Sequence, residues 1–168
     1  MFLKLGVIGL ILAVVTGVLA VLGTTVLGTP ASGVTAVTAR GDLDPLWVNT
    51  RLPNRAMVRI KTRGPIEFVT QRIEIAPLGT TGWHFHPGEN VNVVQQGTLT
   101  LYHDEHCTVG VPYGPDTAFA THPDEIHLAR NESATETLVL FATYFHPKTT
   151  PPTAVRSDAP SPGAGCPE

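Results

Sequence analysis

The sequence has little charge and no excess of basic residues. Charged residues make up 15% of its 168 residues, and 11 Lys and Arg stand against 14 Asp and Glu, giving a formal net charge of −3. Because phosphates are neutralised by clustered Lys and Arg, we expect no nucleic-acid partner. The chain has only two cysteines, too few for a disulfide-built mini-domain or for a four-cysteine zinc site.

Apolar residues and chain breakers are plentiful. Hydrophobic residues make up 42% of the chain, which excludes a disordered polar protein. The length favours a single domain. The 16 glycines and 15 prolines indicate many turns and few long helices.

The N-terminal region differs in composition from the rest. Lys4 is the only charged residue before Arg40, and residues 5–22 are almost wholly apolar. One lysine, a long apolar run and small residues after it are typical of an export signal, and the run is also long enough for a membrane-anchoring helix. We therefore predict that residues 1–39 are a signal peptide or anchor with a linker. The remaining chain would lie outside the cytoplasm, either secreted or held at the membrane.

The C-terminal region, residues 147–168, is rich in proline, and hardly any large apolar residue occurs in it. Such a segment buries too little surface to order itself, so we predict a disordered tail. Cys166 lies in this tail, and Cys107 is its only partner within the chain. In an oxidising compartment the two could form a disulfide that holds the tail to the domain. Free or intermolecular thiols are the alternative.

The region between residues 40 and 146 alternates at period two and is rich in β-branched residues. Turn residues recur every eight to twelve positions. This pattern predicts an all-β sandwich or barrel without a long helix. The expected strands are residues 57–61, 66–75, 83–86, 91–94, 98–102, 118–120, 127–130 and 138–145.

The most informative of the seven histidines are His84 and His86. On a strand, residues i and i+2 project from the same face, so both imidazoles would point the same way. Imidazole nitrogen is a common ligand of divalent transition metals. A third ligand would have to come from another strand, and His127, which opens one, is the best placed candidate. A pair of surface histidines is the simpler alternative.

The residues around this pair resemble the first motif of the cupin superfamily. The stretch from Gly79 through His84, His86 and Glu89 to Gly97 follows the family's order of Gly, His-x-His, Glu and Gly. His127 and Asn131 resemble the His and Asn of the second motif. The resemblance spans about residues 57–145 and implies a small jelly-roll barrel with a metal at its mouth. Fe, Mn, Ni and Zn are all candidates for that metal.

The first motif departs from the family at its acidic ligand. Counting back from Gly97 places Asn90, not Glu89, at the expected position, and a shift by one residue on a strand turns the side chain to the other face. We therefore expect a three-histidine site with open positions, in which the fourth ligand is Asn90, Glu89 or water. Asn92 would share the face of Asn90 and line the pocket.

The resemblance implies a range of activities, because a fold does not select a reaction. The leading hypothesis is a metal-dependent enzyme of oxygenase type acting on a small molecule, with His122 and Glu125 as candidate acid–base groups. An exposed turn is the alternative for those two residues. The rival functions are a barrel that binds a ligand or metal without turnover, and a barrel with no metal. Cupin barrels commonly pair through strand edges, so the resemblance also implies a homodimer as one assembly to test.

Overall fold

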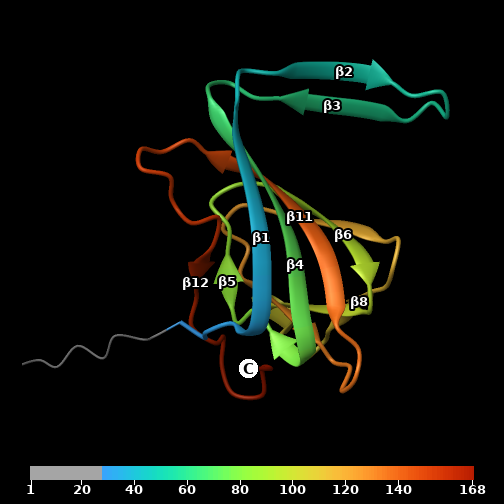
Figure 1. The fold of residues 1–168 in the computed structure, drawn as a ribbon, viewed down its shortest axis with the longest axis vertical. Helices are drawn as coiled ribbons and strands as arrows, with labels where there is room; N and C mark the ends of the chain where they lie inside the picture. The colour runs from blue at the N-terminus through green and yellow to red at the C-terminus, as the bar shows by residue number, and fades with distance from the viewer. Residues whose placement is uncertain (1–27) are drawn as a thin grey trace, which may run out of the picture.

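A computed structural model of the protein describes residues 28–168 (Figure 1). In this part of the chain, strands make up the regular structure apart from one short 3-10 turn. The elements are β1 (Ser32–Leu43), β2 (Trp47–Arg51), β3 (Met57–Lys61), β4 (Ile66–Thr80), β5 (His84–Phe85), β6 (Asn90–Gln96), β7 (Leu99–His103), η1 (Asp104–His106), β8 (Val111–Tyr113), β9 (Ala118–Thr121), β10 (His127–Asn131), β11 (Leu138–Pro147) and β12 (Ser157–Asp158). No helix found within these residues is long and apolar enough to cross a membrane.

The strands form one large antiparallel sheet that curls into a nearly closed barrel. Its main path runs β12-β5-β10-β4-β11-β6-β9, with β1 also paired to β4 and β7 paired to β10 and β8. The longest ladders join β4 to β1 on one side and to β11 on the other. The all-β barrel expected from the alternating sequence is therefore confirmed.

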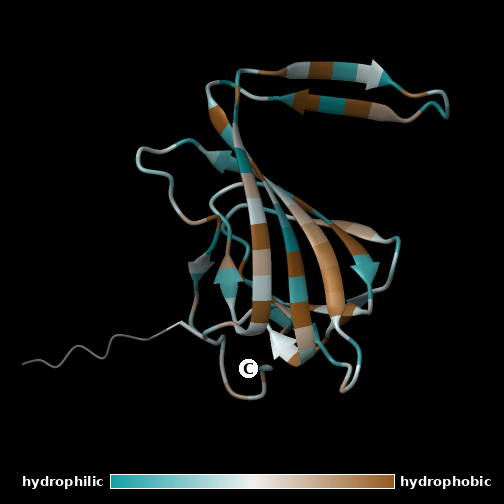
Figure 2. Ribbon diagram, in the orientation of Figure 1, coloured by the Kyte–Doolittle hydropathy of each residue, from teal (hydrophilic) through white to brown (hydrophobic). Residues whose placement is uncertain are grey.

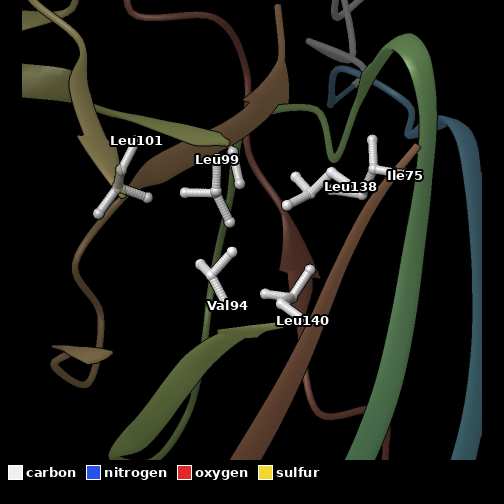
Figure 3. Close-up of a cluster of buried hydrophobic side chains, with 7 residues drawn as sticks. Ile75, Val94, Leu99, Leu101, Leu138 and Leu140 are labelled. Atoms are coloured by element: carbon white, nitrogen blue, oxygen red, sulfur yellow. The ribbon is translucent and has the colours of Figure 1, made fainter. Parts of the chain in front are cut away.

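The core lies inside the barrel, where inward residues from four of the strands meet β10. Ile75 of β4, Val94 of β6, Leu99 of β7 and Leu138 of β11 are each 0% exposed (Figure 3). The long strands alternate along their length between apolar and polar residues (Figure 2). This alternation is the period-two pattern of strands with one face buried, and it explains why the sequence identified them.

The expected domain boundary at residue 40 is wrong, because β1 begins at Ser32. Residues 32–43 pair with β4 from Ser32 opposite Thr80 to Leu43 opposite Ile66. Nearly all β1 residues are exposed, so backbone hydrogen bonds rather than apolar burial hold this strand. A strand of this kind leaves little hydrophobic signal in the sequence. The expected signal or anchor helix lies mainly in residues 1–27, outside the described residues.

Strands β2 and β3 form a separate two-stranded sheet that projects from one end of the barrel (Figure 1). We call residues 46–63 the hairpin. It leaves the barrel where β1 ends and returns where β4 begins, and Leu43 and Ile66 face each other at its base. Its Trp47 is 74% exposed. The hairpin therefore lies outside the barrel and at a distance from its core.

The C-terminal segment, residues 147–168, is ordered, so the prediction of a disordered tail is wrong. It folds back along the barrel, where β12 pairs with β5 (Figure 1). Cys107 and Cys166 form a disulfide with a Cα–Cα distance of 5.1 Å. The segment contributes few apolar residues of its own. It gains order from backbone pairing, which composition does not reveal, and from the disulfide, which was one of the two alternatives for these cysteines.

Candidate metal centre

Three histidine side chains meet inside one end of the barrel. His84 lies on β5 and pairs in register with His127 on β10, and His86 follows two residues after His84. One ring nitrogen from each lies within 4.8 Å of the others. All three side chains are buried, with at most 5% of any one exposed. The structure thus brings together the three residues that the sequence singled out as metal ligands.

Backbone carbonyl groups fix the orientation of each imidazole ring. The Nδ1 atom of every ring lies at hydrogen-bond distance from a carbonyl oxygen, and a carbonyl oxygen only accepts, so Nδ1 must carry the proton. The free lone pair is then on Nε2, as in a metal-binding histidine held by its outer contacts. The three contacts are His84 to Gly82 at 2.9 Å, His86 to Val155 at 2.7 Å and His127 to Glu125 at 2.9 Å.

Burial lowers the pKa of all three histidines, because the charged form loses hydration inside the protein. The pKa of His86 falls to about 3, first through burial and then through its proximity to His127. Burial also holds the pKa of His84 well below its usual value and lowers that of His127. At neutral pH the three rings are therefore uncharged, which is the form that binds a metal.

The donor set suits a divalent transition metal. Three neutral imidazole nitrogens converge, and the cluster contains no carboxylate among the described residues. Imidazole donors are used for zinc, copper, iron and nickel alike, so the set fits a metal without selecting one. Three protein ligands leave coordination positions free for water or substrate, as catalytic sites require.

A small cavity and a larger pocket adjoin the histidines. The cavity, of about 40 Å³, lies inside the barrel, and Asn90 and Asn92 are among its lining residues, as the alternation predicts. The oxygen of Asn90 already accepts hydrogen bonds from Asn92 and from Thr121, each at 2.7 Å. Both lone pairs of this amide oxygen are engaged, so Asn90 holds the cavity wall and has no free oxygen to offer a metal.

Glu89 does not join the histidine cluster. Its carboxylate lies 2.8 Å from Nδ1 of His122, and both side chains are substantially exposed. The one-residue displacement in the motif thus turns Glu89 outward, as expected for a strand. Of the alternatives for the fourth ligand, water or substrate fits the described geometry best.

The predicted acid–base pair also lies away from the cluster. The His122 side chain is 71% exposed and contacts Glu89. The Glu125 carboxylate lies 2.6 Å from Nδ1 of His103 and accepts a hydrogen bond from the backbone N–H of His122. Neither side chain lines the cavity or the pocket beside the histidines. They belong to a surface turn, and Glu125 serves the site through its backbone carbonyl alone.

Tyr144 is a site residue that the sequence interpretation missed. It lies on β11, its ring centroid is 5.1 Å from that of His86, and its hydroxyl donates to the side-chain oxygen of Gln71 at 3.1 Å. Burial raises the pKa of Tyr144, so the phenol stays protonated. The sequence alternation could have placed Tyr144 on the inward face of β11, since Tyr144 shares that face with Ala142 and Leu140, which are buried.

Arg156 is the second missed residue, and it comes from the C-terminal segment. It lines a pocket of about 550 Å³ together with His84, His86 and Tyr144. The same segment supplies the Val155 carbonyl that orients His86. Its position depends on tertiary contacts, so no local sequence pattern indicated it.

Comparison with known proteins relates these features to a family. The Cupin domain family matches residues 71–144. No curated protein matches the chain significantly.

Similar solved structures resemble the barrel only in part. The polyketide cyclase RemF from Streptomyces resistomycificus is 25% identical with a TM-score of 0.42, and the match covers 46% of this chain and 53% of that one. An uncharacterised protein with a double-stranded β-helix domain from Klebsiella pneumoniae is 14% identical with a TM-score of 0.46, covering 69% and 84% of the two chains. A predicted oxalate decarboxylase from Thermotoga maritima is 18% identical with a TM-score of 0.41, covering 50% and 83%. This chain spans about half the length of the polyketide cyclase.

The region that matches the family contains most of β4, all of β5 to β10 and most of β11. It therefore includes the strands that carry His84 and His127, and His86, which directly follows β5. The hairpin and the C-terminal segment lie outside it. On the family match, residues 71–144 of the chain belong to the cupin superfamily.

Proposed function

We propose that this protein is a metal-dependent enzyme of oxygenase type that acts on a small molecule bound in the pocket beside the three histidines. One observation carries the proposal: three buried, uncharged imidazoles, each fixed by a backbone carbonyl, converge next to a pocket of about 550 Å³. A purely structural cluster would not require all three rings to be held in the same tautomer.

His84, His86 and His127 would hold the metal. A divalent ion on three neutral ligands would keep its positive charge, polarise a substrate oxygen and, as iron, support O₂ chemistry. Around it, Asn90 and Asn92 hold the cavity wall through their mutual hydrogen bond, and Tyr144 holds the pocket wall through Gln71. These contacts fix the walls before a substrate arrives, as preorganised sites require.

The alternative is a binding protein that holds a ligand or metal without turnover. The observation in its favour is that the described walls of the buried cavity contain no Asp or Glu. Once the three histidines hold a metal, such a cavity has no carboxylate left to move a proton in catalysis. Activity measurements separate the two functions.

We also propose that the domain works outside the cytoplasm, either secreted or anchored at a membrane. The Cys107–Cys166 disulfide supports this, since such bonds persist in oxidising compartments and are rare in the cytosol. The apolar run at residues 5–22 is consistent with export. Fractionation of cells that make the full chain tests it: recovery in the cytosolic fraction with both thiols free would contradict the proposal.

Metal analysis tests the metal site. The full chain without a histidine tag is expected to carry about one equivalent of a divalent metal, as one three-ligand site predicts. His84→Ala and His127→Ala should lose it. His106→Ala is the matched control, because His106 is exposed in η1 and should leave the metal content unchanged. A parent protein that neither carries metal nor takes up added Fe(II), Mn(II), Ni(II) or Zn(II) would overturn the proposal.

Oxygen consumption then separates enzyme from binding protein. The iron-loaded parent is expected to consume O₂ when a pool of small organic molecules is supplied, and His127→Ala should not. Metal binding together with ligand binding, but without turnover in any mixture, would favour the alternative function.

A further inference from the structure

The C-terminal segment is attached to the barrel around the histidine cluster rather than at a remote surface. The backbone N–H of Ala159 donates to the Trp83 carbonyl at 2.9 Å, and the Trp83 indole donates to the Pro167 carbonyl at 2.9 Å. Within β12, Asp158 pairs in register with His84. The segment thus forms one side of the site, next to the first ligand strand.

Arg156 is the cationic residue of this segment that lines the pocket, beside Val155 and Asp158. Its side chain is 26% exposed and lines the same pocket as His84, His86 and Tyr144. One guanidinium nitrogen donates to the Thr81 carbonyl at 2.7 Å, and another donates to the Asp158 carboxylate. A guanidinium has five N–H donors, so these two contacts hold the group in place and leave others for a ligand.

The pocket wall carries two arginines, Arg40 and Arg156, against one carboxylate, Asp158, and this balance favours an anion. The three histidines are neutral, and the other arginine of the pocket wall, Arg40, has its charge compensated by Glu67 at 2.6 Å. The partner of Arg156 is Asp158, whose side chain is 55% exposed, so water screens that pair more strongly. Arg156 is therefore the cation best able to meet an incoming carboxylate, which a guanidinium can bind through two parallel hydrogen bonds.

We propose that Arg156 recognises the carboxylate of a small organic acid beside the histidine cluster, and that the site is complete only when the disulfide-tied C-terminal segment is docked. This inference rests on the proposed function, since it names the substrate class of the same site. Arg156 acts here as a binding residue. Val155, whose carbonyl oxygen accepts a hydrogen bond from Nδ1 of His86, acts as a positioning residue.

The test compares two probes of equal size, lactate and lactamide. Lactate carries a charged carboxylate where lactamide carries a neutral carboxamide. Binding is measured by calorimetry on the full chain, with and without added metal, and the metal content of every sample is recorded. The variants are Arg156→Gln, Arg156→Lys and Cys166→Ser. Arg72→Gln is the matched control, because Arg72 pairs with Glu74 two residues on, as Arg156 pairs with Asp158, but it does not line this pocket.

The parent is expected to bind lactate at least about tenfold more tightly than lactamide, as a charge-assisted contact predicts. Arg156→Gln should bring lactate down to the level of lactamide without changing the metal content, Arg156→Lys should retain part of the preference, and Arg72→Gln should behave as the parent. Equal affinities for the two probes in the parent, or an unchanged preference in Arg156→Gln, would overturn the carboxylate assignment while leaving a metal-loaded site intact.

The remaining measurements distinguish this inference from the proposed function and test whether the C-terminal segment must be docked. If the parent takes up no metal, the proposed function fails, and the lactate preference of the metal-free protein and of its Arg156→Gln variant still decides this inference. Cys166→Ser should weaken lactate binding more than lactamide binding, because the released segment no longer holds Arg156 in the pocket. Lactate affinity equal to that of the parent in Cys166→Ser would overturn the requirement for docking. Circular dichroism of each variant confirms that the barrel is folded.

Discussion

The hairpin and the C-terminal segment both lie outside the region that matches the cupin domain, yet they differ in how they relate to the barrel. The hairpin points away from it, and the C-terminal segment folds back onto it (Figure 1). Trp47 of the hairpin is 74% exposed, whereas Val155 and Ala159 of the C-terminal segment are 6% and 1% exposed. The hairpin does not contact the histidine site, whereas the C-terminal segment supplies part of it.

The difference shows what composition can and cannot indicate. Strand β3 of the hairpin has an alternating sequence, and it forms a two-stranded ladder with β2. The proline-rich segment has no such pattern, and its order comes from the disulfide and from hydrogen bonds to barrel carbonyl groups. Composition tells whether a segment can order itself, but it does not tell whether a neighbouring surface will order it.

The two tryptophans of the chain give the largest expected contrast. Trp83 is 0% exposed and packs beneath the C-terminal segment, so Trp83→Ala should cost about 3–5 kcal/mol of unfolding free energy. Trp47→Ala should change it by less than about 0.5 kcal/mol, because the side chain is exposed. Urea denaturation of the metal-free protein measures both. Similar losses in the two variants would mean that the hairpin is as integrated as the C-terminal segment.

The disulfide should give the next largest effect. It joins residues 59 positions apart, and its removal in Cys107→Ser or Cys166→Ser should lower the unfolding free energy by about 2–4 kcal/mol. Denaturation of the parent with and without reductant is the measurement. Reduction that leaves the midpoint unchanged would show that the other contacts alone hold the segment.

Acidification should destabilise the metal-free protein through the site histidines. Their pKa values are lowered in the folded state, so below about pH 6.5 the unfolded chain binds more protons and becomes favoured. For His86, with a pKa of about 3, the loss continues through pH 5 at up to about 1.4 kcal/mol per pH unit.

Unfolding curves at pH 7, 6 and 5 measure this dependence. His86→Gln should give a shallower slope than the parent, and His106→Ala should keep the parent's slope. A stability independent of pH over this range in the metal-free parent would contradict buried, uncharged histidines.

Much of the barrel followed from the sequence because its strands bury one face. The strands at residues 118–120, 127–130 and 138–145 were expected close to their observed positions. β1 was missed because its residues are mostly exposed and the strand depends on its ladder with β4. Short strands such as β8 and β12 carry too few residues to show a period.

The candidate site was predictable to the extent that it is local. The spacing of His84 and His86 predicted that both rings point the same way, and His127 was selected because it opens another strand and matches the second cupin motif. Tyr144 could have been found from the alternation of β11. Arg156 could not, because a disulfide and contacts distant in sequence position it.

The smallest expected effect is that of removing the hairpin. Leu43 and Ile66 face each other at its base, so residues 44–65 can be replaced by Asn-Gly, the pair favoured in a two-residue turn. The shortened chain should keep the metal content of the parent, and its unfolding free energy should change by less than about 1 kcal/mol, because the shorter connection costs little entropy and no barrel core residue is lost.

The same variant tests the homodimer. The hairpin exposes Trp47 and Met57, together with Arg51, Arg59 and Lys61. Its region is basic, whereas residues 64–168 carry 4 Lys and Arg against 12 Asp and Glu. A homodimer held together through the hairpin would become a monomer when the hairpin is removed, and light scattering measures this change directly. A dimer of unchanged affinity would place the interface on the barrel edges instead. If the shortened chain lost its metal, the hairpin would contribute to the site as the C-terminal segment does.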